Sequence, residues 1–151
     1  MSEAVVVQCA AAGRARLEVR IENRSERTVH VFDSERMPYF IADDAGLLVL
    51  YGVNPPDPDT DYYGIEIPTT RPLAAGAAVD HDVSLDPLFL RDHYETAREP
   101  LALRGTVRVR CEVGWGETPI EPSERHLYSI ESVLAWQRLA AAPPVEVELS
   151  D

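Results

Sequence analysis

The sequence predicts one mainly all-β domain, an antiparallel β-sandwich of about eight strands with one C-terminal helix. Apolar and polar residues alternate in several short segments, most plainly in residues 17–21, 29–31 and 101–113, as they do when one face of a strand is buried. Turn-forming residues separate these segments at short intervals, which is typical of sandwiches. The length of 151 residues suffices to bury a core without metals or disulfides, so residues 1–151 are treated as a single domain.

The opening segments are predicted to form a hairpin. Residues 15–22 and 28–33 both alternate, and the polar residues 23–26 between them supply turn chemistry. A first strand over residues 4–11 precedes this pair. We therefore expect the second and third strands to be neighbours in one sheet.

A second hairpin is predicted from residues 37–42 and 47–53, which flank acidic turn residues and a glycine. Prolines within residues 55–58 then fix φ and remove backbone donors, so regular structure is expected to stop there. The later expected elements are strands at 64–67, 78–85 and 145–149, a turn at 72–76, a helical turn at 86–90 and a loop at 91–100.

The clearest alternation lies in residues 101–113, where the apolar residues have odd numbers. It predicts one long strand, or two strands joined near Gly105. The polar face of this run carries Arg108 and two further arginines, whereas residues 15–22 carry Glu18 and a second glutamate. Opposite charges of this kind would pair across strands if the two segments were neighbours.

The apolar period changes to that of a helix in residues 129–141. Ile130 and Val133 share one face with later apolar residues, Ser129 is placed to cap the N-terminus, and two prolines after residue 142 stop the helix. About eight short strands and one late helix favour an immunoglobulin-like sandwich, with a small open barrel as the competing fold.

The charge of the chain restricts its partners. The formal net charge is -12 and the pI is about 4.7, which argues against binding to nucleic acid or to an anionic membrane. All 14 basic residues are arginine, which excludes chemistry that requires lysine. The N-terminus has no basic region before its short apolar stretch, and no later run is long enough to span a bilayer, so a cytoplasmic protein is expected.

Two cysteines, Cys9 and Cys111, lie in strand-like segments and could face each other across the sandwich. A disulfide and a pair of buried thiols remain the two alternatives, and a reducing compartment favours the thiols. Both cysteines lie on apolar strand faces rather than in electropositive clefts, so a catalytic thiol is not expected.

A resemblance to a known family follows from two patterns. These are Leu17-x-Val19-x-Ile21-x-Asn23-x-Ser25 followed by Val29-x-Val31, and the later sequence Pro72-Leu73-Ala74-Ala75-Gly76 that enters a strand. The chain resembles the immunoglobulin-like domains of bacterial proteins and is similar to the bacterial intracellular proteinase inhibitor type of sandwich. That resemblance implies a scaffold whose loop binds another protein, but no inhibitory residue has a matching position here.

An acidic loop is the sharpest local feature, because carboxylates on alternate positions are a common way to gather calcium. The spacing of its aspartates begins an EF-hand loop, but Tyr62 stands where that loop has glycine and Pro68 where it has the bidentate glutamate. A solvated acidic loop is therefore the alternative to a metal site. The weak candidate ligands are Asp57, Asp59, Asp61 and Glu66.

The same loop is predicted to be a contact surface. Prolines stiffen residues 54–61, and two tyrosines follow, so binding would order few additional degrees of freedom. Trp115 between two glycines is either an exposed anchor or a cover over the core, and the tyrosines could instead pack under the loop. The predicted partner-binding residues are Asn54, Asp57, Asp59, Asp61, Tyr62, Tyr63 and Trp115.

No motif in the chain predicts a catalytic residue or a cofactor. The four histidines are isolated in sequence, and there is no nucleophile elbow, phosphate loop or dinucleotide fingerprint. The leading hypothesis is a non-enzymatic cytoplasmic protein-binding module, an inhibitor, immunity or assembly protein whose partner has a basic face. The alternatives are a calcium- or small-ligand-binding sandwich and an enzyme with an unrecognised site.

Overall fold

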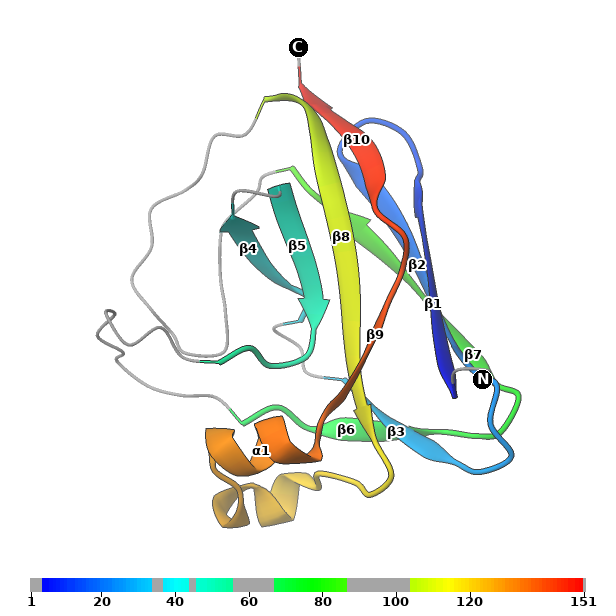
Figure 1. Cartoon of the computed structure of the whole chain (residues 1–151), viewed down its shortest axis with the longest axis vertical. Coiled ribbons are helices and arrows are strands. Elements are labelled where there is room, and N and C mark those ends of the chain that lie inside the picture. The colour runs from blue at the N-terminus through cyan, green and yellow to red at the C-terminus, as the bar shows by residue number, and fades with distance from the viewer. Residues whose placement is uncertain (1–3, 34–36, 44–45, 56–66, 87–103, 151) are drawn as a thin grey trace.

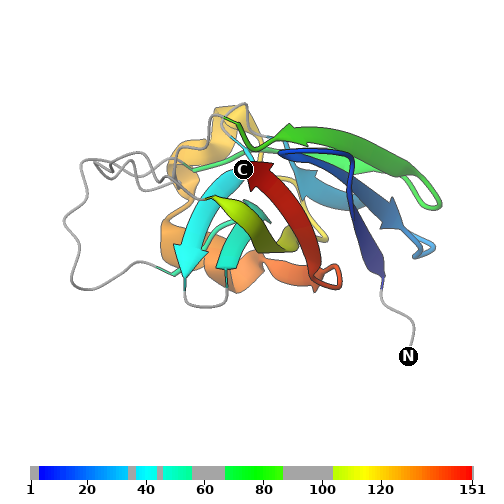
Figure 2. The same ribbon diagram turned by 90° about the horizontal axis from the view of Figure 1, so that it is seen from above.

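The computed structural model describes residues 4–33, 37–43, 46–55, 67–86 and 104–150 (Figure 1). In these ranges ten strands form two sheets, accompanied by one short 3-10 helix and one α-helix. Seen from above, β1, β2 and β7 lie on one side of the molecule and β5, β8 and β10 on the other (Figure 2). The prediction of a mainly β, sandwich-like fold with one late α-helix is confirmed.

The smaller sheet has the order β1-β2-β7 and is antiparallel throughout. Its strands are β1 (Val5–Ala11), β2 (Arg16–Asn23) and β7 (Ala78–Ser84). Alternate residues of β2, namely Leu17, Val19 and Ile21, are buried, while the residues between them are exposed or half-buried. The sequence period therefore places one face of this sheet against the core.

The larger sheet has the order β4-β5-β8-β3-β6, with β9 and β10 also paired to β8. Its strands are β3 (Val29–Phe32), β4 (Tyr39–Asp43), β5 (Gly46–Tyr51), β6 (Thr70–Leu73), β8 (Gly105–Gly116), β9 (Arg138–Ala141) and β10 (Val145–Ser150). The predicted hairpin of β4 and β5 and the closing strand β10 are confirmed.

Strand β8 is the central strand of the larger sheet, since β3, β5, β9 and β10 all pair with it. Val109 pairs with both β5 and β10, and Val113 with both β5 and β9. Trp115 pairs with both β3 and β9. Strands β5 and β3 therefore share one edge of β8, and β10 and β9 share the other. The β5–β8 pair is parallel, whereas the other pairs of this sheet are antiparallel.

The predicted opening hairpin is wrong. Strand β2 pairs with β1 and β7, whereas β3 pairs with β6 and β8, so the chain crosses from one sheet to the other after Asn23. Alternation marks which face of a strand is buried, and both strands bury a face in the same core. It does not specify the neighbour, so a hairpin and a crossover between facing sheets give the same pattern.

Asn23 holds this crossover in place. Its side chain is fully buried, and among the described residues it is the only polar or charged one in the core. The amide nitrogen donates to the carbonyl oxygens of Arg27 and Leu73 at 2.8 Å each. The amide oxygen accepts from the backbone N–H and the hydroxyl of Ser25 at 2.9 and 2.7 Å. The buried amide is therefore satisfied on both ends, as a low-dielectric site requires.

The expected charge pairing also has a different partner. Strand β8 lies in the sheet opposite β2, so its arginines are not cross-strand neighbours of Glu18. The arginines of β2 pair instead with aspartates of β7: Arg20 lies 3.2 Å from Asp80, and Arg16 forms an ion pair with Asp82. The sequence showed the charges but not which strand lies next to which.

The helix is shorter than predicted. Helix α1 spans Ile130–Trp136, and Gln137 leaves it with an extended ψ of 133°. Residues 138–141 then pair with β8 as strand β9 instead of continuing the helix. The predicted cap is confirmed, because the Ser129 hydroxyl accepts from the backbone N–H of Ser132 at 3.2 Å. A 3-10 helix at Pro122–Leu127 precedes α1.

Strand β6 was not predicted because Pro72 lies within it. It is an edge strand of the larger sheet, and there a proline is tolerated because one side of the strand forms no ladder bonds. The predicted turn follows it, since the backbone N–H of Ala77 donates to the carbonyl of Ala74 at 2.9 Å and Gly76 has a φ of 78°. The strand at 64–67, the helical turn at 86–90 and the loop at 91–100 fall mainly or wholly outside the described residues.

The core lies between the two sheets and contains apolar residues of both. Val19 and Ile21 from the smaller sheet belong to the same buried cluster as Val49, Val109 and Cys111 from the larger sheet. Burial of such side chains is the main stabilising contribution to a sandwich. Neither helix found in the described ranges is long and apolar enough to cross a membrane.

We predict that Asn23→Ala destabilises the protein by about 2–4 kcal/mol, because it leaves buried backbone groups without partners. Chemical denaturation followed by circular dichroism measures this change. The control is Gln8→Ala on the exposed face of β1, which should change the free energy of unfolding by less than about 0.5 kcal/mol. Equal effects of the two substitutions would show that Asn23 is not a fixing point of the fold.

Candidate functional site

The predicted binding loop begins inside the described residues and continues beyond them. Asn54 is half-buried, and its amide nitrogen donates to the carbonyl of Pro55 at 3.4 Å. The partner-binding candidates outside the described residues are Asp57, Asp59, Asp61, Tyr62 and Tyr63, and Glu66 lies outside them too. Their binding roles, and the calcium site, stay predictions. What the structure gives is the way each end of this loop is held.

The start of the loop is fixed by Gln137, the residue that ends α1. Its side-chain oxygen accepts from the backbone N–H of Val53 at 2.8 Å, and its side-chain nitrogen donates to the carbonyl of Val53 at 2.9 Å. One amide thus replaces a strand neighbour for Val53. Gly52 and Gly114 leave the room for it, because a Cβ at either glycine would collide with the Gln137 side chain.

Beyond the loop, the chain is held at residues 69 and 70. The backbone N–H of Ile120 donates to the hydroxyl of Thr70 at 2.9 Å, and the N–H of Thr70 donates to the carbonyl of Ile120 at 3.3 Å. The carbonyl of Thr69 accepts from the N–H of Asp33 at 2.9 Å. Residues 120 and 137 therefore hold the two ends of the segment from residue 54 to residue 69.

Trp115, the remaining candidate, lies at the end of β8 and is only 7% exposed. The guanidinium carbon of Arg138 lies 5.3 Å from the centre of its ring. Of the two alternatives for this residue, its burial favours a cover over the core. Trp115 borders the surface at a small cleft of about 180 Å³. The cleft is lined by Ala4, Ser25, Arg27, Thr28, Val29, Trp115, Glu117 and Arg138.

The glycines around Trp115 make space for the helix. A Cβ at Gly116 would overlap the indole of Trp136, which lies over it. The Trp136 N–H donates to the carbonyl and hydroxyl of Thr118 at 3.0 Å each, and its ring meets Phe32 edge-on at 5.4 Å. Trp136 thus packs against the sheet. The glycines therefore serve close packing at this point.

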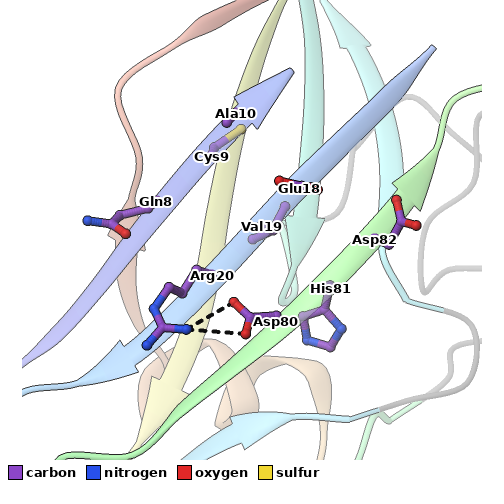
Figure 3. Close-up of a pocket in the computed structure, with 9 residues that line it drawn as sticks. All are labelled: Gln8, Cys9, Ala10, Glu18, Val19, Arg20, Asp80, His81 and Asp82. Carbon is purple, nitrogen blue, oxygen red and sulfur yellow. Dashed lines mark hydrogen bonds and ion pairs between the residues drawn. The ribbon is translucent and has the colours of Figure 1, made fainter. Parts of the chain in front are cut away.

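A groove of about 510 Å³ lies on the outer face of the smaller sheet (Figure 3). It is formed by three successive cross-strand rows of β1, β2 and β7. The rows are Gln8, Arg20 and Asp80; Cys9, Val19 and His81; and Ala10, Glu18 and Asp82. Because side chains alternate along a strand, the outer two rows present side chains to the groove, and the middle row contributes backbone.

The charges of this groove largely compensate each other. Arg20 donates to both carboxylate oxygens of Asp80 at 3.2 Å, as Figure 3 shows, and Arg16 pairs with Asp82 beside it. Glu18 adds one further negative charge. The paired side chains are about half exposed or more, so each pair contributes little to stability. The groove is a polar surface suited to hydrogen bonding.

The middle row places the side chains of Cys9 and His81 between the sheets, and Cys9 meets Cys111 of the larger sheet there. Cys9 is half-buried, Cys111 is buried, and both are free thiols. The Cys111 thiol donates a hydrogen bond to Cys9, which lowers the pKa of Cys9, while this hydrogen bond and burial raise the pKa of Cys111. On β7, the ring of His81 stacks on Tyr51 with centres 4.6 Å apart, and burial is the main cause that lowers the pKa of His81.

No metal cluster is found in the parts of the chain that the structure describes, where no three histidine, cysteine or carboxylate side chains are grouped to hold an ion. A scan against models of known protein families gives no match, and neither the curated proteins nor the solved structures include one that matches. A function for this chain therefore follows only from its own sequence and geometry.

Two parts of the site were missed by the sequence analysis. The hydrogen bonds between Gln137 and Val53 had no sequence signal, because they join residues 84 positions apart. The groove had one: Arg16 and Arg20, like Asp80 and Asp82, occur on the same face of their strands. Matching these two charge patterns would have predicted that β2 and β7 are neighbours.

We predict that Gln137→Ala destabilises the fold by about 1–3 kcal/mol and speeds hydrogen exchange at the Val53 amide, because it leaves both backbone groups of Val53 without this partner. Gln137→Glu is the matched variant, since it keeps the acceptor for the Val53 N–H and loses the donor to the Val53 carbonyl. An unchanged exchange rate at Val53 in Gln137→Ala would contradict the proposed anchoring of Val53 by Gln137.

We also predict a pH dependence that depends on His81. Burial, and next Arg71, lower its pKa below the ordinary value of 6.5, against the opposing effect of Asp33 and Asp80. Above that value the ring is neutral in both states; as the pH falls below it, the unfolded chain takes up a proton first, so stability falls. Melting temperatures measured from about pH 7.5 to about pH 5.5 should drop less in His81→Phe, which keeps the stack on Tyr51. Equal drops would exclude His81 as the cause.

Proposed function

We propose that the protein is a non-enzymatic, cytoplasmic protein-binding module with an immunoglobulin-like sandwich, and that residues 54–63 hold a protein partner with a basic face. The main support is the anchoring of both ends of the segment that contains them. Gln137 holds Val53 through two hydrogen bonds, and Ile120 holds Thr70 through two more. A segment fixed at both ends loses less conformational entropy on binding than a free one.

The charge of this segment sets the kind of partner. Residues 54–66 include three aspartates and one glutamate and no arginine, in a chain whose net charge is -12. A field of one sign speeds encounter with a partner of opposite sign and disfavours acidic competitors. Tyr62 and Tyr63 add aromatic surface, which is enriched in binding interfaces.

Two features support the immunoglobulin-like part of the proposal. The fold has two facing sheets of mainly antiparallel strands, and a cysteine pair lies between them. Immunoglobulin-like domains commonly bind through loops at one end of the sandwich, and a rigid scaffold with variable loops is the usual arrangement of such modules.

The proposal is tested by affinity capture from the native host with three baits, quantified by mass spectrometry. The baits are the wild-type chain, the loop variant Asp57→Asn/Asp59→Asn/Asp61→Asn, and a control that removes three exposed carboxylates elsewhere, Glu26→Gln/Asp86→Asn/Glu146→Gln. We expect one basic protein to be retained by the wild type and the control and lost from the loop variant. Because the two variants change the net charge equally, the difference reports the loop.

The binding constant of the captured protein provides the second measurement. Tyr62→Ala/Tyr63→Ala should weaken the affinity by about tenfold or more. Raised salt should weaken it further, because salt screens the attraction between the acidic segment and its basic partner. The proposal fails if the loop variant retains the same proteins in the same yield as the wild type.

A further inference from the structure

The two thiols of the chain meet at the interface between its sheets. Cys9 belongs to β1 of the smaller sheet and Cys111 to β8 of the larger sheet, and these strands pack against each other. Their side chains are within hydrogen-bonding reach, with the Cys111 thiol donating to the Cys9 sulfur. Neither is bonded to another cysteine.

The strands around the pair hold both sulfurs in place. Cys9 lies opposite Val19 of β2, and Cys111 lies opposite Val49 of β5. Both valines are at most 1% exposed. The carbonyl of Cys111 also accepts from the N–H of Ala142 at 3.0 Å. Packing of this density keeps the two thiols close in the folded state without any covalent bond.

The two thiols differ in access to solvent. Cys111 is fully buried within the core cluster, whereas Cys9 is half-buried at the side of it. A reagent in solution therefore reaches Cys9 first, and Cys111 lies directly behind it. This order, an accessible thiol backed by a buried one, suits a two-step exchange with a small oxidant.

We propose that Cys9 and Cys111 are an oxidation site, at which a small-molecule disulfide converts the two thiols into a covalent bond between the sheets. The proposal does not depend on the proposed protein partner. It concerns a reaction of the chain itself and predicts a second covalent form of the protein with the same fold.

The reaction balances as a thiol–disulfide exchange. Cys9 loses its proton, and its sulfur attacks one sulfur of the reagent; the reagent's S–S bond breaks, and one thiol leaves with the electron pair and a proton. Cys111 then loses its proton to solvent and attacks the Cys9 sulfur, and the second reagent thiol leaves. The two protein thiols lose two hydrogen atoms, and the reagent is reduced to two thiols.

The bond is expected to stabilise the fold. It would join residues 9 and 111 and so close a long loop in the unfolded chain, which lowers the entropy of that state. We expect the oxidised form to melt about 5–15 °C above the reduced form.

The test incubates the folded wild-type chain with oxidised glutathione at neutral pH. The expected result is a monomer that has lost two hydrogen atoms by intact mass and contains no thiol that reacts with a chromogenic reagent. Peptide mapping should show Cys9 joined to Cys111, and reduction should restore the lower melting temperature. Two free thiols after prolonged incubation, or a disulfide-linked dimer as the main product, would overturn the proposal.

Two single variants test the order of attack. Cys111→Ala should stop at a mixed disulfide between Cys9 and glutathione, because no second thiol is present to displace it. Cys9→Ala should leave Cys111 unmodified until denaturant unfolds the chain. Modification of Cys111 in the folded Cys9→Ala variant would contradict the order of access, and the wild-type experiment remains decisive if either variant fails to fold.

Discussion

The fold depends on the buried amide of Asn23. At this point the chain leaves the smaller sheet for the larger one, and the amide binds carbonyls of Arg27, before β3, and of Leu73, at the end of β6. The backbone of Asn23 also exchanges hydrogen bonds with Gly76 and Ala77, just before β7. One residue thus fixes both passages between the sheets, β2 to β3 and β6 to β7. A buried amide has this capacity only when all its groups find partners.

Alternation was sufficient to locate most strands but not their neighbours. The segments around residues 23–26 and 43–46 have similar sequence character, yet the first is a crossover and the second a hairpin. In the hairpin Asp43 faces Gly46 directly, and the φ of 118° at Gly46 closes the connection. In the crossover, Asn23 at the end of β2 turns its side chain into the core. Which outcome occurs depends on the carbonyl of Leu73, 50 residues away, and a local sequence pattern holds no information about it.

Of the proposed binding segment, the sequence shows only the composition. The acidic, proline-rich character of residues 54–61 is visible in the sequence, whereas the anchors of that segment come from residues 120 and 137. Gly114 and Gly116 show the same difference. The sequence left open whether Trp115 between these glycines is an exposed anchor, but the two glycines accommodate the Gln137 and Trp136 side chains. A glycine permits both unusual φ values and close approach, and the sequence does not tell which is used.

Strand β8 connects the features that the two proposals use. Cys111, in the middle of β8, faces Cys9. Three residues further along β8, Gly114 makes room for the Gln137 side chain that holds Val53. Any displacement of β8 relative to β1 would therefore move the thiol pair and the anchor of the acidic segment together. The ion pairs on the outer face of the smaller sheet do not resist such a displacement, since they join β2 to β7 within one sheet. Core packing and the Asn23 crossover resist it, and a bond between Cys9 and Cys111 would act along the same direction.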